Sequence, residues 1–273
     1  MSLPRSVPLA AWTAAVLAGR AGVGDAVPAV AGDEEHTVAW APADPAGPGA
    51  DEAFGHPVPD PAYLSDLLVL LSAAGDRGRA ARVRVALPAP GDALGLPPAP
   101  GLVGHACDTG ECVVVEHLTG EAGGFHVIAV PDVADFGTDA DRGYQVTWNA
   151  YVTARSAPPG ALTPPASVAE ADLELRVALR DVTRDLERLD VAAWSPAGRP
   201  DRPDPLPPLP DAFSSRARHL LASAAQVLDI VDAAREDPGG ALSGHETARR
   251  DAALGRVHRT ARRAVEAAVN LPG

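Results

Sequence analysis

Three acidic residues directly precede a histidine near the start of the chain. Asp33, Glu34 and Glu35 come just before His36, where a segment with strand-like alternation begins. Carboxylates beside an imidazole at a sheet edge are groups that general acid and base catalysis uses. The alternative is a solvated acidic turn, because most loops are plain connections. We take Asp33, Glu35 and His36 as catalytic candidates.

Two other segments could bring polar groups to the same place. Residues 90–100 are rich in proline and glycine and include Asp92, and residues 132–142 end at Arg142. If these loops converge on residues 33–36, they would form a pocket lined by His36, Asp92 and Arg142. The glycine motifs of nucleotide sites and the GxSxG motif are missing. The catalytic residues and the reaction therefore stay unknown.

Four side chains in one stretch could bind zinc. They are His105, Cys107, Cys112 and His117. The paired spacing of zinc knuckles is missing, and ordinary cysteines are usually small buried apolar groups. We therefore expect no metal and no cofactor, and keep this set as the alternative.

The last helix that the sequence predicts has a basic stripe. Its members are Arg249, Arg256, Arg259, Arg262 and Arg263. Most charged helix faces are only solvated, and the other interpretations are docking on the acidic first half of the chain or contact with an acidic partner. The candidates for partner binding are Arg249, Arg256, Arg259 and Arg263.

The composition is that of a globular protein with an acidic surface. The chain has 273 residues, 46% of them hydrophobic but only 4% aromatic, and its net charge is -13. Residues 1–160 hold 8 Arg and 19 Asp and Glu, a net charge of -11. Such a surface repels phosphate backbones and anionic lipid, so we expect no nucleic acid and no membrane as partner. A protein partner is possible, and the oligomeric state stays open.

The pattern of hydrophobic residues predicts an α+β protein in two domains. Residues 1–160 should form a mixed sheet of about five strands with flanking helices, and residues 161–273 a bundle of three helices. Ser167 with Glu170, and Ser243 with Glu246, are expected capping boxes of the first and third of these helices. The predicted strands are 36–41, 82–87, 111–117, 125–130 and 144–152; the predicted helices are 6–18, 22–32, 63–74, 102–109, 167–189, 214–236 and 243–270.

The first segment resembles an export signal only in part. Residues 6–18 are apolar and follow Arg5, and an Ala-Val-Ala sequence stands at 29–31. Arg20 and Asp25 interrupt the approach to that sequence, and the apolar run is shorter than a membrane span. We expect a cytoplasmic protein, with export by residues 1–31 as the alternative.

The chain as a whole resembles conserved proteins of high-GC actinobacteria for which no activity is known. The resemblance rests on Leu3-Pro4-Arg5, Gly32-Asp33-Glu34, Gly110-Glu111 and the proline-rich residues 87–97. It implies a cytosolic setting and transfers no functional residue.

Two functional hypotheses follow. The first is a non-enzymatic binding or scaffold protein, in which the bundle and the proline-rich residues 196–210 recognise another protein. The second is an enzyme or small-ligand binder with its site at the loops near residues 33–36, 90–100 and 132–142.

Overall fold

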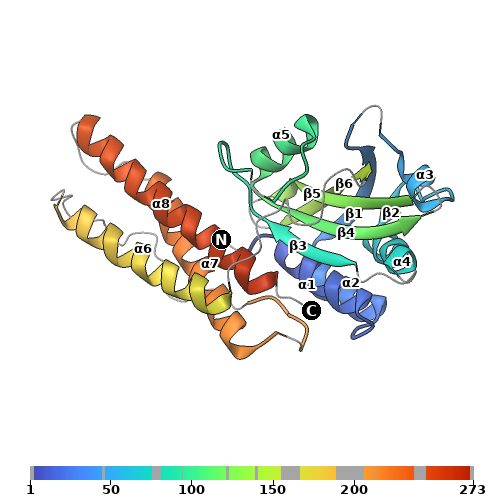
Figure 1. Cartoon of the computed structure of the whole chain (residues 1–273), viewed down its shortest axis with the longest axis horizontal. Coiled ribbons are helices and arrows are strands. Elements are labelled where there is room, and N and C mark those ends of the chain that lie inside the picture. The colour runs from blue at the N-terminus through green and yellow to red at the C-terminus, as the bar shows by residue number, and fades with distance from the viewer. Residues whose placement is uncertain are drawn as a thin grey trace. The chain divides into compact units, whose positions relative to one another are not determined.

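The computed structural model describes residues 3–44, 47–75, 81–93, 95–120, 123–138, 141–154, 167–188, 206–211, 213–236 and 244–270. The chain forms two compact units, one of residues 4–164 with 207–212, the other of residues 165–206 and 213–273 with the first three residues. Figure 1 labels their elements. The elements of the first unit are α1 (Ser6–Leu17), α2 (Val23–Ala31), β1 (Glu35–Pro42), α3 (Ala50–Phe54), β2 (Ala62–Tyr63), α4 (Leu64–Gly75), β3 (Arg82–Ala86), α5 (Pro100–Thr109), β4 (Cys112–Gly120), β5 (Gly123–Thr138) and β6 (Asp141–Ala154). Those of the second are α6 (Val168–Arg188), α7 (Ser215–Glu236) and α8 (Gly244–Val269).

The first unit is built on a mixed six-stranded sheet, which confirms the predicted α+β class. Its strand order is β2-β1-β6-β5-β4-β3. β1 and β6 are parallel, with Glu35 opposite Gln145 and Pro42 opposite Val152. The other neighbours are antiparallel, and β5 with β6 forms the longest pair. β2 and α3 lie in a stretch without a clear hydrophobic period, which explains why the sequence did not predict them.

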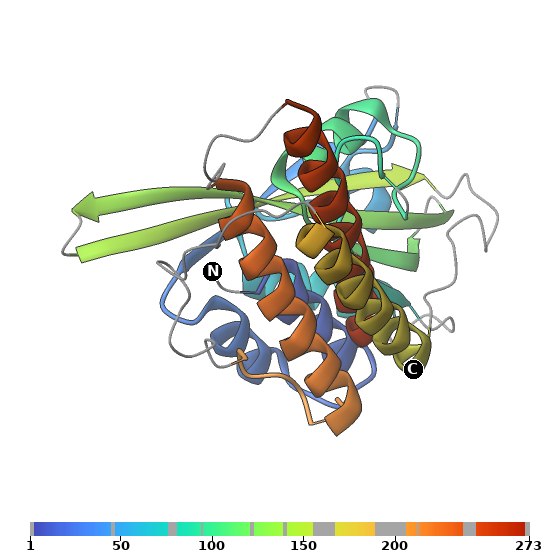
Figure 2. The same cartoon turned by 90° about the vertical axis from the view of Figure 1, so that its left-hand side faces the viewer.

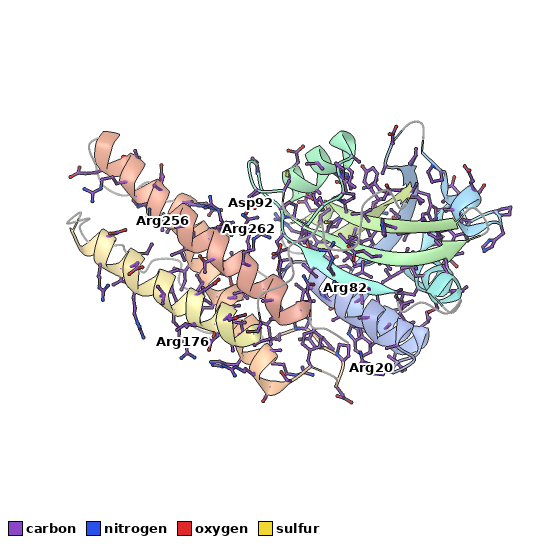
Figure 3. The ribbon with its side chains drawn as sticks, viewed as in Figure 1. Arg20, Arg82, Asp92, Arg176, Arg256 and Arg262 are labelled. Carbon is purple, nitrogen blue, oxygen red and sulfur yellow. The ribbon has the colours of Figure 1, made fainter. Side chains whose placement is uncertain are left out.

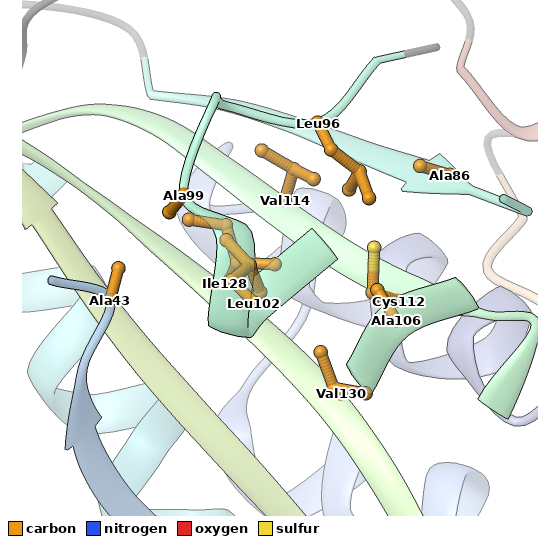
Figure 4. Packing of buried hydrophobic residues seen from close by; sticks show 10 residues of the cluster. All are labelled: Ala43, Ala86, Leu96, Ala99, Leu102, Ala106, Cys112, Val114, Ile128 and Val130. Atoms are coloured by element: carbon orange, nitrogen blue, oxygen red, sulfur yellow. The ribbon is translucent and has the colours of Figure 1, made fainter. Parts of the chain in front are cut away.

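Helices cover both faces of the sheet. α1 and α4 pack on one face, with α2 against them, and α5 packs against β5 on the other (Figure 1). Successive strand residues point to opposite faces, so the odd and even positions of β6 meet different helices. The core under α5 joins Leu102 and Ala106 of the helix to Cys112, Val114 and Ile128 of the sheet (Figure 4).

The first helix is a buried part of this unit. Val7 is fully buried and Leu9 is 1% exposed. The carboxylate of Glu111 accepts the backbone N–H of Ser6 at 2.7 Å, which satisfies a free donor at the start of α1. The indole N–H of Trp12 donates to the carbonyl of Pro208 at 2.9 Å. This hydrogen bond fastens residues 207–211, the described end of the proline-rich connection, to the sheet unit. Leu209 and Pro210 of this segment are buried.

The structure describes three helices of the second unit, and α8 contacts both α6 and α7. The apolar residues of α7 from Leu220 to Val231 that are buried are Leu220, Leu221, Ala224, Val227, Leu228 and Val231. At the start of α6, Ser167 and Glu170 exchange hydrogen bonds of 2.9 and 3.2 Å, as the capping box requires. The second expected box depends on Ser243, which lies outside the described residues. Within the described ranges, no helix is long and apolar enough to cross a membrane.

Candidate functional site

The structure places His36 in a buried polar network on the face of the sheet that α1 covers. The indole N–H of Trp148 donates to His36 Nδ1 at 3.0 Å. The other ring nitrogen, Nε2, lies 3.4 Å from a carboxylate oxygen of Glu34, which in turn accepts a hydrogen bond of 2.9 Å from Arg5. The side chain of His36 is only 2% exposed.

These contacts determine the protonation state of the imidazole. An indole can only donate, so His36 Nδ1 must carry a lone pair and the hydrogen must be on Nε2. Burial lowers the pKa of His36, against the opposing charge of Glu34. Burial raises the pKa of Glu34, but the hydrogen bond and charge of Arg5 outweigh this and the pKa lies below its ordinary value. The neutral ring serves to join β1 to β6, and a base buried in this way has little access to a substrate.

The other catalytic candidates do not gather around His36. Asp33 and Glu35 are exposed, and Glu34 is the carboxylate that faces the ring. Asp92 lies in a tight turn, bridged to Ala89, before α5 on the opposite side of the sheet. Residues 132–138 and 141–142 are paired strands rather than a loop, so the predicted convergence of three loops is not found.

A second polar cluster lies on the opposite face, beside α5. His105 of this helix is held between two groups of the sheet, with Nδ1 2.8 Å from the hydroxyl of Tyr151 and Nε2 2.8 Å from Asp132. The amide of Asn149 donates to the second oxygen of Asp132 at 2.9 Å. His105 and Tyr151 also meet edge to face, with ring centroids 5.9 Å apart. Helix and sheet together thus build a chain of carboxylate, imidazole and phenol.

Carboxylate, imidazole and phenol stand in the order that activates a hydroxyl group in covalent catalysis. The carboxylate of Asp132 favours a hydrogen on Nε2, which leaves Nδ1 free to accept the hydrogen of the phenol. Burial, and then the charge of Asp132, raise the pKa of Tyr151 above its ordinary value. The phenol therefore stays protonated at rest. The side chain of His105 is 21% exposed and that of Asp132 57% exposed, so solvent reaches the cluster.

Sequence reasoning considered His105 only as a zinc ligand. Its real partners come from β5 and β6, 27 and 46 residues further along the chain. The thiol of Cys107 points to the carbonyl of Ala89 at 3.6 Å, and Cys112 is enclosed in the core under α5. The side chain of His117 is not described. No group of three potential metal ligands occurs in the part of the chain that the structure describes.

A two-stranded arm continues from this cluster. Past Asp132, β5 pairs only with β6 among the described strands, out to Thr138 opposite Asp141. Figure 2 shows two long neighbouring strands extending beyond the rest of the sheet. Val133 is 43% exposed, Phe136 52% and Tyr144 37%. We call residues 132–138 and 141–144 the β-arm.

The β-arm has its own local packing. Phe136 stands opposite Gly143, and its ring occupies the space that a Cβ at Gly143 would need. This aromatic cover over a glycine is a device that stabilises a strand pair. Tyr144 has the guanidinium of Arg5 5.6 Å from its ring centre, a cation–π distance. The β-arm thus has stabilising contacts of its own although it is only two strands wide.

The arginines of α8 are partly paired within their own unit. Arg256 contacts Asp185 of α6 at 2.6 Å, and Arg263 contacts Glu266 one turn later at 2.8 Å. Arg249 and Arg259 are exposed. Arg262 is 7% exposed, because at about 100° per residue it lies well off the line of the others. Figure 3 shows Arg256 on α8 and Arg176 on α6.

Comparison with known families agrees with the division into two units. Residues 6–164 match the family described as Rv1486c-like protein, N-terminal domain, and residues 169–266 match Rv1486c-like protein, C-terminal domain. The chain belongs to the Rv1486c-like family. Neither description names an activity. No curated protein and no solved structure matches the chain significantly.

Proposed function

We propose that the protein is a binding protein of the cytoplasm, which uses its β-arm to add a strand from a partner. The observation that carries this proposal is the outer edge of β5 from Asp132 to Thr138, which has no neighbouring described strand. An unpaired strand edge offers backbone hydrogen bonds to an extended segment. Seven residues at about 3.3 Å each give an edge of about 23 Å, enough for an ordinary strand.

The exposed side chains support contact with a protein. Val133, Phe136 and Tyr144 expose apolar surface on a hairpin that supports no core of its own. A two-stranded hairpin is marginally stable in water, so a third strand would stabilise it as well as bind it. Natural proteins usually protect such edges with lysine, proline or a covering element. Here Pro131, which lacks an N–H, stands only at the start of the edge.

Charge favours a basic partner over a second copy of the chain. The edge from Asp132 to Thr138 has two carboxylates, Asp132 and Asp135, and no cation. Pairing two such edges would bring four carboxylates together, and like charges across strands are destabilising. The surrounding domain is also acidic, with a net charge of -11 over residues 1–160. The occupant that fits is an extended segment of alternating basic and apolar residues.

Peptide binding tests this assignment directly. A labelled peptide of alternating Arg and Val should bind the full chain, and its Glu and Val counterpart should not. Val133→Glu should weaken the binding by roughly tenfold or more, a loss of about 1.4 kcal/mol, because it replaces an apolar contact by a charge. Val69→Glu is the matched control, since Val69 of α4 is 55% exposed. Equal binding of both peptides, or equal loss in both variants, would refute the proposal.

A photo-crosslinking residue at position 133 identifies the partner in the native host. We expect a cross-link to an extended basic segment of one protein, and no such product from the same group placed at position 69. A cross-link that forms at both positions, or that maps to an acidic helix of the captured protein, would contradict strand addition at the β-arm.

A further inference from the structure

We propose that Tyr151 is a nucleophile that His105 activates, and that it accepts an acyl group from neutral esters. This activity is distinct from strand addition, although Asp132 at the start of the β-arm takes part in it, and it corresponds to the enzyme alternative with a different set of residues. The geometry that carries it is the sequence of contacts from Asp132 through His105 to Tyr151, each 2.8 Å long. Nucleophile, base and orienting carboxylate within hydrogen-bond distance are the arrangement of covalent catalysis on unrelated folds.

The three groups have distinct roles. Tyr151 supplies the attacking oxygen, and His105 Nδ1 lies where it can take the phenolic hydrogen. Asp132 is a positioning residue, because it contacts only the far nitrogen of the ring and fixes which nitrogen carries the hydrogen. Asn149 holds the second carboxylate oxygen of Asp132. The carboxylate therefore cannot rotate freely away from the imidazole.

The proposed step balances in atoms and charge. The phenolic oxygen of Tyr151 bonds to the ester carbonyl carbon while its hydrogen passes to His105 Nδ1. The bond to the alkoxy or aryloxy group then breaks, and that group leaves with the hydrogen from His105. Water next attacks the acyl-tyrosine with His105 taking its proton, and the acid leaves while Tyr151 regains its hydrogen. No oxidant, reductant or further reactant is needed.

The substrate class follows from charge. The cluster contains Asp132 and no arginine, in a domain whose first 160 residues have a net charge of -11. Phosphorylated and other anionic donors would be repelled, and neutral esters would not. The cluster has no free donor for a developing oxyanion among these four residues, because the amide of Asn149 donates to Asp132 and to the carbonyl of Thr147. Base assistance alone should contribute about 10²-fold to 10⁴-fold.

The simpler interpretation is that the cluster only fastens α5 to the sheet. Both interpretations require the contacts, so stability measurements do not separate them. Chemical reactivity does, because a structural hydrogen bond gives the half-buried Tyr151 no advantage over an exposed tyrosine. Tyr63, which is 57% exposed on β2, is the internal control.

p-Nitrophenyl acetate is the probe. The full chain should release one equivalent of p-nitrophenolate in a burst, and peptide mass spectrometry should find the acetyl group on Tyr151 at least about 10² times faster than on Tyr63. Tyr151→Phe, which keeps the ring, should abolish the burst, while Tyr63→Phe should leave it unchanged. Acetylation of both tyrosines at similar rates, or a burst that survives in Tyr151→Phe, would overturn the proposal.

The roles of the other two residues are tested in the same assay. His105→Ala should lose the faster acetylation of Tyr151 over Tyr63 and recover part of it with added imidazole, which a structural role would not produce. The acetylated peptides are the readout, because imidazole itself releases p-nitrophenolate from the probe. Asp132→Asn should slow acetylation and, in nitrogen NMR of the ring, move hydrogen from Nε2 of His105 to Nδ1. An unchanged tautomer with a slower rate, or no rescue by imidazole, would refute the assigned roles.

Discussion

Breaking the buried ion pair between β3 and β4 should destabilise the sheet unit strongly. Arg84 Nη2 lies 2.8 Å from Glu116, and the two side chains are 8% and 10% exposed. Glu116→Ala leaves the guanidinium buried with the carbonyl of Gly95, at 3.1 Å, as its remaining described acceptor. Removing one partner of a buried pair costs about 3–5 kcal/mol. The hydrogen bond to Gly95 keeps the guanidinium partly satisfied. We therefore expect Glu116→Ala to lower the free energy of unfolding by about 3 kcal/mol, the low end of that range.

The double variant separates the charge effect from lost packing. Replacing Arg84 by Met and Glu116 by Leu removes both charges and keeps most of the volume, so its stability should lie within about 1.5 kcal/mol of the natural chain. Urea unfolding followed by tryptophan fluorescence is suitable, because Trp12, Trp40 and Trp148 all belong to this unit. A cost of Glu116→Ala below about 1 kcal/mol would refute the reasoning, as would a double variant as unstable as the single one.

Three further outcomes follow from the same structure. Ile128→Ala, in the fully buried core under α5, should lower the free energy of unfolding by about 2–5 kcal/mol, measured by urea unfolding. Val69→Ala, at a position that is 55% exposed, should lower it by less than about 0.5 kcal/mol. Gly137→Ala should disorder the tip of the β-arm, measured as faster amide hydrogen exchange there, because its φ is +91° and a Cβ would meet the carbonyl oxygen of Asp141. The pKa of His36 is lowered from its ordinary 6.5, so its contribution to the free energy of unfolding is complete above pH 6.5 and falls as the pH drops below that value. His36→Gln should remove this pH dependence, and an unchanged slope would contradict it.

The positions of helices and strands followed largely from local patterns. The alternation of Arg and Val predicted β3, the leucines of residues 64–71 predicted α4, and Gly110 ends α5 with φ +77° as its C-cap role requires. Ser167 and Glu170 form the expected cap. The prediction failed at the end of β5 and the start of β6, because these residues pair with each other and receive no support from a buried face. Without a buried face, these residues need no regular alternation of hydrophobic and polar side chains, which is the pattern that predicts a strand.

Sequence reasoning found His36 but not what the side chain contacts. The sequence analysis took Asp33 and Glu35 as candidates and left out Glu34. Only the course of the chain into β1 decides that Glu34 faces the ring, and Arg5 donates to the carboxylate of Glu34. The indole of Trp148 comes from a strand 112 residues away. Proximity in sequence was thus misleading about which carboxylate matters.

The sequence by itself determined the local properties of this protein: an acidic surface, a core of small aliphatic residues, where most helices and strands lie, and a change from period two to period 3.6 near residue 165. These properties depend on side chains within a few turns of one another. Tertiary structure alone decided that β1 pairs with β6, and that Asp132, His105 and Tyr151 meet beside α5. Such contacts depend on strand order, which is a property of the whole sheet. Strand pairing and helix packing join residues that lie far apart in the chain, so no local periodicity of the sequence reveals them.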